Sequence, residues 1–138
     1  MTIIFNYKSI TRPDGTKVKT PSIPVELSGK NKIDTVALLD SGADQAAISL
    51  EIAEILGLDV TGKKHPAYGI GGKVDSIQSK MRISVGKGHE YYSFLVPVKV
   101  ILGKYDFGII LGRLGFFSKF VISFDQYKEK VFLKKTSR

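Results

Sequence analysis

Apolar and polar residues alternate over most of this chain, and such a two-residue period predicts β-strands. The segments with strand patterns are residues 3–7, 18–27, 33–39, 80–85, 91–101, 107–111, 120–124 and 130–133. Pro13-Asp14-Gly15-Thr16 predicts a turn after the first of them. Pro21 and Pro24 exclude a helix from the second segment and favour an edge strand, because proline cannot donate a ladder hydrogen bond.

Only one segment has a clear helical spacing of apolar residues. Ser49 can cap its first turn and Gly57 can end it. The apolar face between them consists of Leu50, Ile52, Ala53, Ile55 and Leu56. A second short helix is expected over residues 114–119, although Gly115 weakens it. Many short strands with one or two short helices predict a mainly β fold, either a barrel or a sandwich.

A chain of 138 residues, 43% of them hydrophobic, predicts one globular domain spanning residues 1–138. The sequence contains no cysteine, so disulfides and thiolate metal sites are excluded. The first residues lack the basic head and long apolar centre of a signal peptide. No apolar run approaches the ~20 residues that cross a bilayer. We therefore expect a soluble, cytoplasmic protein that has no membrane partner.

The formal net charge of +8 raises nucleic acid as a possible partner. However, the basic residues are scattered, with small clusters only at Lys63-Lys64 and Lys134-Lys135. They form no stripe interleaved with aromatic residues. We therefore expect no specific nucleic-acid binding, and a basic nucleic-acid-binding β-barrel remains as an alternative.

The most informative stretch is Leu38-Leu39-Asp40-Ser41-Gly42-Ala43, where an apolar strand runs directly into a carboxylate. A carboxylate near a core loses solvation unless hydrogen bonds or a charge partner offset the loss. Aspartate, serine and glycine are also common in turns. The position therefore indicates either a turn or a functional site.

Two further features follow in order. Tyr68-Gly69-Ile70-Gly71-Gly72 is typical of a mobile hairpin tip, with an ordinary glycine turn as the alternative. It is not a dinucleotide-binding motif, because Val74 stands where the last glycine of that motif belongs. The other feature is Ile109-Ile110-Leu111-Gly112-Arg113, which joins an apolar strand to a glycine and an arginine.

These three features, in this order, resemble the retropepsin-like aspartic proteases, and the resemblance spans residues 33–134. It implies a closed β-barrel or sandwich subunit that is active as a symmetric homodimer. Asp40, Ser41 and Gly42 would then be the catalytic residues. The chain has one such motif, so the resemblance implies that Asp40 from each of two copies meets at the two-fold axis. The expected activity is hydrolysis of peptide bonds in extended substrates by an aspartic endopeptidase.

The resemblance also assigns the residues around the acid. Those expected to bind peptide are Ala43, Asp44, Gly69, Ile70, Gly71, Gly72 and Ile110. Those expected to support the site are Asp44, Leu111, Gly112 and Arg113, with an ion pair between Asp44 and Arg113. Ile48, Ile70 and Ile110 suggest pockets for apolar side chains. Residues 1–32 match the family least, and they could supply interface strands, cover a sheet edge or restrict access to the cleft.

Other chemistry finds less support in the sequence. His65 and His89 are isolated, without the spacing of a metal pair, and we expect neither a metal nor a cofactor. Asp106-Phe107-Gly108 imitates a kinase triplet without the motifs that accompany it. The principal alternative to an enzyme is a dimer of the same fold that binds peptides with little or no turnover.

Overall fold

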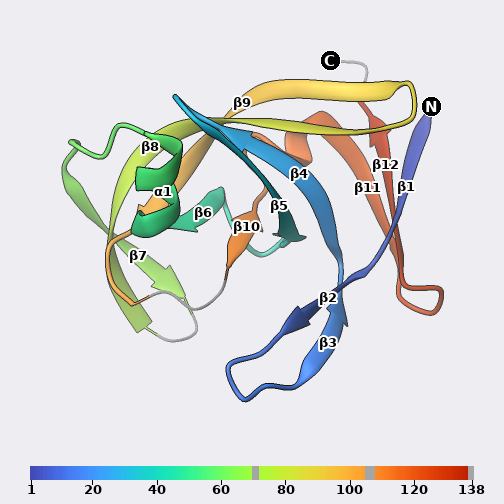
Figure 1. Cartoon of the computed structure of the whole chain (residues 1–138), viewed down its shortest axis with the longest axis horizontal. Coiled ribbons are helices and arrows are strands. Elements are labelled where there is room, and N and C mark those ends of the chain that lie inside the picture. The colour runs from blue at the N-terminus through green and yellow to red at the C-terminus, as the bar shows by residue number, and fades with distance from the viewer. Residues whose placement is uncertain (70–71, 105–107, 137–138) are drawn as a thin grey trace.

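The structure is a computed structural model, and it describes residues 1–69, 72–104 and 108–136. Its strands are β1 (Thr2–Asn6), β2 (Lys8–Thr11), β3 (Lys17–Thr20), β4 (Ser22–Ser28), β5 (Lys32–Leu39), β6 (Ala46–Ser49), β7 (Lys64–Gly69), β8 (Gly72–Lys87), β9 (Glu90–Ile101), β10 (Ile109–Leu111), β11 (Phe120–Asp125) and β12 (Lys130–Lys135). The helices are α1 (Leu50–Leu56) and the short 3₁₀ helix η1 (Phe117–Lys119). The prediction of a mainly β fold is confirmed (Figure 1).

The largest sheet has seven strands in the order β4-β5-β10-β6-β9-β8-β7. Strand β4 also pairs with β8, through Glu26 to Ser28. At Pro24, β4 pairs with β5 only, because the pairing with β8 covers just Glu26 to Ser28. A proline, which has no N–H to donate, is tolerated at such a one-sided position. The short strand β10 is parallel to β5 on one side and antiparallel to β6 on the other. It therefore lies between the two strands that flank Asp40.

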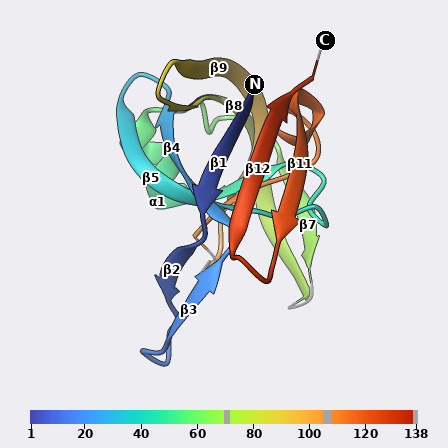
Figure 2. The ribbon, with the colours of Figure 1, turned by 90° about the vertical axis from the view of Figure 1, so that its right-hand side faces the viewer.

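A second sheet has the order β1-β12-β11 and brings the two ends of the chain together (Figure 2). Its inner face buries Ile3, Phe5, Val131 and Leu133. Phe116 and Phe120 contact each other with their rings tilted and their centroids 5.2 Å apart. Because Phe120 also lies against Tyr92 and Phe94 of β9, these rings join the two sheets into one core.

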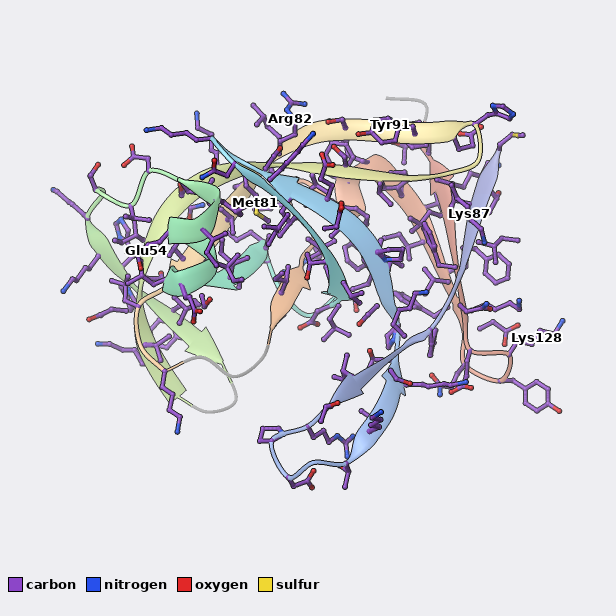
Figure 3. All side chains as sticks on the ribbon, in the orientation of Figure 1. Glu54, Met81, Arg82, Lys87, Tyr91 and Lys128 are labelled. Atoms are coloured by element: carbon purple, nitrogen blue, oxygen red, sulfur yellow. The ribbon has the colours of Figure 1, made fainter. Side chains whose placement is uncertain are left out.

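The long hairpin of β8 and β9 shows how the alternating pattern builds that core. Figure 3 shows Met81 pointing inward from β8 and Arg82, the next residue, pointing outward. Met81 is 1% exposed, whereas Arg82 is solvent-exposed. At the far end of the hairpin, Lys87 donates to the carbonyl of Ile4 at 2.8 Å, which fastens the hairpin to β1.

The predicted helix is confirmed, with both of its end signals. The hydroxyl of Ser49 accepts the backbone N–H of Ile52 at 3.1 Å. Gly57 adopts a left-handed conformation with φ 70°, which ends the helix. Ala53 and Leu56, which belong to the helix, are fully buried against the core.

The second predicted helix is shorter than expected. Only Phe117–Lys119 is helical, as one 3₁₀ turn, and Gly115 before it has a φ of 89° that interrupts a longer helix. The sequence pattern also missed β2, β6 and β7 and underestimated the length of β8. No helix in the described part of the chain is long and apolar enough to cross a membrane.

Candidate active site

The site is centred on Asp40, which follows β5 directly. Its backbone N–H donates to the carbonyl of Leu111 at 3.0 Å, which continues the parallel pairing of β5 with β10. The carboxylate Oδ1 accepts the backbone N–H of Gly42 at 2.9 Å. Asp40 is half-buried, and its Oδ2 receives no hydrogen bond from the described residues. The loop thus fixes one carboxylate oxygen and leaves the other available.

The segment after β10 holds the Asp40 loop from the other side. The N–H of Arg113 donates to the carbonyl of Ala43 at 3.0 Å, and the N–H of Leu114 donates to the backbone carbonyl of Asp44 at 2.7 Å. The guanidinium Nη1 of Arg113 also donates to the carbonyl of Ser41 at 2.8 Å. Two segments that are far apart in the sequence are therefore tied together by three hydrogen bonds.

Gly112 makes this close contact possible. A Cβ atom on Gly112 would lie 2.6 Å from the carbonyl oxygen of Gln45 and 2.7 Å from its backbone nitrogen. Since real side chains do not approach backbone so closely, only glycine fits here. Gly42 is less constrained, because the nearest atom to its Cβ would be Asp40 Oδ1 at 3.2 Å.

The expected ion pair between Asp44 and Arg113 is wrong. Asp44 instead pairs with Lys99, whose Nζ lies 3.2 Å from Oδ2. The reason is the parallel pairing of β6 with β9, which places Ala47 opposite Lys99 and so brings β9 beside the residues that lead into β6. Arg113 is occupied by the carbonyl of Ser41. Asp44 keeps 54% of its side chain exposed and Lys99 keeps 26%.

A second polar contact lies beside this pair, and sequence reasoning missed both. The amide of Gln78 in β8 donates to the side-chain oxygen of Gln45 and to the carbonyl of Val98. Gln78 and Lys99 are polar residues in strands where polar and apolar residues alternate, so the residues around them in the sequence give no sign of a site. Only the register between strands reveals their place.

The β7–β8 hairpin contains the glycines that the resemblance assigned to substrate. Gly69 and Gly72 face each other in the last pair of its ladder, and Gly72 has a φ of 111°. Ile70 and Gly71 lie outside the described residues. Tyr68, next to this pair, is 77% exposed. Figure 1 shows the hairpin projecting on the side of the molecule toward which β5 ends.

The apolar residues near Asp40 differ in their exposure. Ile110 is half-buried between Leu38 of β5 and Ala47 of β6. Leu111 is fully buried, in keeping with a supporting position. The expectation that Ile48 lines a pocket is wrong, because Ile48 is 0% exposed and faces the core.

Two hollows of the described chain lie away from Asp40. A groove of about 640 Å³ lies between the end of α1 and β8, with Lys30, Asp59, Gln78 and Pro97 among its lining residues. A smaller hollow of about 250 Å³ is lined by residues of β5, β6, α1 and β10. Asp40 lines neither of them. Among the described residues no group of three or more acidic or histidine side chains could hold a metal ion.

The sequence matches no protein-family model and no curated protein. Comparison of structures does find relatives. The chain is similar to a retropepsin-like aspartic protease from Rickettsia conorii, with a TM-score of 0.59 and 23% identity over 96% of this chain and 90% of that one. It is also similar to the EIAV protease in complex with the inhibitor HBY-793, with a TM-score of 0.45 and 25% identity over 69% of this chain and 83% of that one. The chain therefore has the retropepsin-like fold.

Proposed function

We propose that this protein is an aspartic endopeptidase that hydrolyses extended peptides as a symmetric homodimer. One observation carries the proposal. In a retropepsin-like fold, the only Asp-Ser-Gly sequence of the chain lies at the end of β5, with the carboxylate oriented by Gly42 and the loop clamped by the segment after β10.

Two copies are required by the chemistry. Hydrolysis of a peptide bond needs a base to activate water and an acid to protonate the carbonyl oxygen. Two adjacent carboxylates share one proton, because both cannot ionise readily, and aspartic proteases are the general example of this arrangement. A chain with one such aspartate supplies half of the pair, so a second copy supplies the other half.

In the proposed reaction, the ionised Asp40 of one copy takes a proton from water as the water oxygen attacks the peptide carbonyl carbon. The protonated Asp40 of the other copy gives its proton to the carbonyl oxygen. The resulting diol then collapses and the C–N bond breaks. The carboxyl that received the water proton protonates the departing nitrogen, and the other carboxylate takes a proton from one of the diol hydroxyls as the new carbonyl forms. Every proton returns, so the pair is regenerated without a cofactor.

The groups around Asp40 suit an extended peptide. Asp44 is half-exposed beside the loop, where its carboxylate can accept main-chain N–H groups of the substrate. Ile110, which is half-buried in β10, would offer an apolar side chain to the substrate. We propose that Ala43 and the glycines of the β7–β8 hairpin contribute the remaining main-chain contacts.

The test is cleavage of a diverse peptide mixture, read by mass spectrometry from acid to neutral pH at several protein concentrations. Wild type is compared with Asp40→Asn, which keeps the shape of the side chain but cannot hold the shared proton. Asp34→Asn is the matched control, because Asp34 is an exposed residue of the same strand, away from the clamp. We expect cleavage by wild type and Asp34→Asn and none by Asp40→Asn.

The concentration series adds a second criterion. If two copies form the site, the rate per subunit rises with protein concentration until the dimer is saturated. Peptide binding without cleavage by folded wild-type protein at every pH would instead favour the non-catalytic peptide-binding dimer. Cleavage by Asp40→Asn at the wild-type rate would refute the mechanism.

A further inference from the structure

The strands β2 and β3 form an arm that projects from the body of the molecule (Figure 1). They pair only with each other, from Lys8 opposite Thr20 to Thr11 opposite Lys17. The arm is fixed at its base, where the N–H of Tyr7 donates to the carbonyl of Glu129 and Lys19 lies 3.7 Å from the Glu129 carboxylate. An isolated two-stranded ribbon is at best marginally stable in water. The base contacts hold this arm to the body, and a further contact beyond the base would stabilise it.

The tip of the arm is a well-formed turn. The Asp14 carboxylate accepts hydrogen bonds from the hydroxyl of Thr16 at 2.7 Å and from its N–H at 2.9 Å, and these bonds lower the pKa of Asp14. Gly15 supplies the positive φ, 87°, that the turn requires. The arm is thus a defined hairpin, and its tip satisfies its own polar groups.

The two faces of the arm differ in chemistry. Ile10 and Val18 are directly opposite each other and share one face, where Ile10 is 40% exposed. Lys17 and Lys19, with their cross-strand partners Thr11 and Ser9, lie on the other face, because side chains alternate between faces along each strand. Ile10 is exposed and Val18 is half-buried, so this pair forms a small apolar contact surface on a projecting ribbon.

We infer that the arm docks its Ile10 and Val18 face on a second copy of this chain and so assembles the active dimer. This inference rests on the proposed function, since a site with one Asp40 is incomplete without that copy. Figure 1 shows the arm projecting on the same side as the β7–β8 hairpin, the side toward which β5 ends. A second copy that brings its own Asp40 to the site therefore comes within reach of the arm.

The charge of the arm disfavours contact between the arms of the two copies. Residues 8–20 carry the cations Lys8, Arg12, Lys17 and Lys19 and the single acid Asp14. Two such arms repel each other, so arm-to-arm pairing across the axis is disfavoured. The arm instead reaches the body of the partner copy, where its two free strand edges can also donate and accept hydrogen bonds.

Two variants test this inference. In the short-arm variant, residues 9–19 are replaced by Asn-Gly, which can close a two-residue hairpin between the facing residues Lys8 and Thr20. In the second variant, Ile10→Ser and Val18→Ser remove the apolar face and keep the full arm. The matched control is Ser9→Ala with Thr11→Ala on the opposite face. Circular dichroism and thermal unfolding check that each variant folds.

Sedimentation equilibrium gives the dimer dissociation constant, and peptide cleavage gives the rate per subunit. We expect roughly a tenfold or greater increase of the dissociation constant for both arm variants, since two apolar side chains lose their burial. The control stays within about twofold of wild type. Cleavage by the arm variants falls at low concentration and recovers at high concentration.

The outcomes separate the two proposals. An unchanged dissociation constant in the Ile10→Ser, Val18→Ser protein overturns the role of the arm and leaves the protease intact. Faster cleavage at an unchanged dissociation constant also overturns it, because the arm would then cover the cleft of its own subunit. An arm-dependent dimer that cuts no peptide supports the arm and refutes the protease. Wild-type protein that stays monomeric at every concentration refutes both.

Discussion

Gly112→Ala tests whether the segment after β10 truly clamps the Asp40 loop. The added Cβ would lie 2.6 Å from the carbonyl oxygen of Gln45, which is 0.8 Å inside the 3.4 Å where ordinary contact begins. Neither atom is at the end of a flexible side chain, so the two backbone segments must separate. The hydrogen bonds from Arg113 to Ala43 and from Leu114 to Asp44, now 3.0 and 2.7 Å, would then stretch to or beyond a useful length.

The expected cost follows from these changes. Overpacking of a well-filled site costs about 1–3 kcal/mol, and each weakened hydrogen bond costs about 0.5–1.5 kcal/mol. Together they predict a loss of about 2–6 kcal/mol in the free energy of unfolding, a large part of the ~5–15 kcal/mol typical of a domain. The cleavage rate of the protein that remains folded also falls, because the displaced loop carries the Asp40 carboxylate.

Urea unfolding and peptide cleavage measure the two effects. Gly103→Ala is the matched control, because its Cβ would meet only Val74, at 3.9 Å. We expect the control to unfold and cleave like wild type. If Gly112→Ala unfolds within about 0.5 kcal/mol of wild type, the close approach is not a structural requirement and the clamp is refuted.

The remaining predictions concern single side chains. Arg113→Ala costs about 1 kcal/mol in urea unfolding, because it removes one exposed charge-assisted hydrogen bond to Ser41; a loss of 3 kcal/mol or more would indicate a buried ion pair instead. Lys99→Met removes the cation that pairs with Asp44. The free energy of unfolding changes by less than about 1 kcal/mol, while the KM for peptides changes and loses its dependence on salt. An unchanged KM would show that this pair is remote from substrate. Ser49→Ala removes the cap of α1 and costs about 1 kcal/mol in thermal unfolding, and a stability equal to wild type would contradict that cap.

The sequence predicted those parts of the fold that depend on local pattern. The helix α1 followed from its apolar face and its two end residues, and most strands followed from alternation. The turn before β3 followed from Pro13 to Thr16. In each case, the signal lies within a few consecutive residues, so no knowledge of distant neighbours is needed.

The parts that failed depend on strand register. Strand β6 is only four residues long, and its pattern is hidden because Ser49 also caps the helix that follows. The partner of Asp44 was assigned to Arg113, although β6 pairs with β9 and brings Lys99 closer. Ile48 was assigned to a pocket, whereas the inward side of β6 faces the core. Sequence periodicity shows which residues share a face of a strand, but it does not show which strand lies beside them.

The place of β10 explains why the chemistry-bearing motifs stand so far apart in the sequence. The Asp40 loop leaves β5 and enters β6, and β10 pairs with both strands from between them. This loop has to pass the inserted strand, and the backbone groups that it does not satisfy internally find partners on the inserted segment. Leu111, Arg113 and Leu114 supply those partners, and Gly112 gives the space in which they reach the loop. The glycine and the aspartate are therefore two halves of one structural solution, and this is why neither motif predicts the site as well alone as both do together.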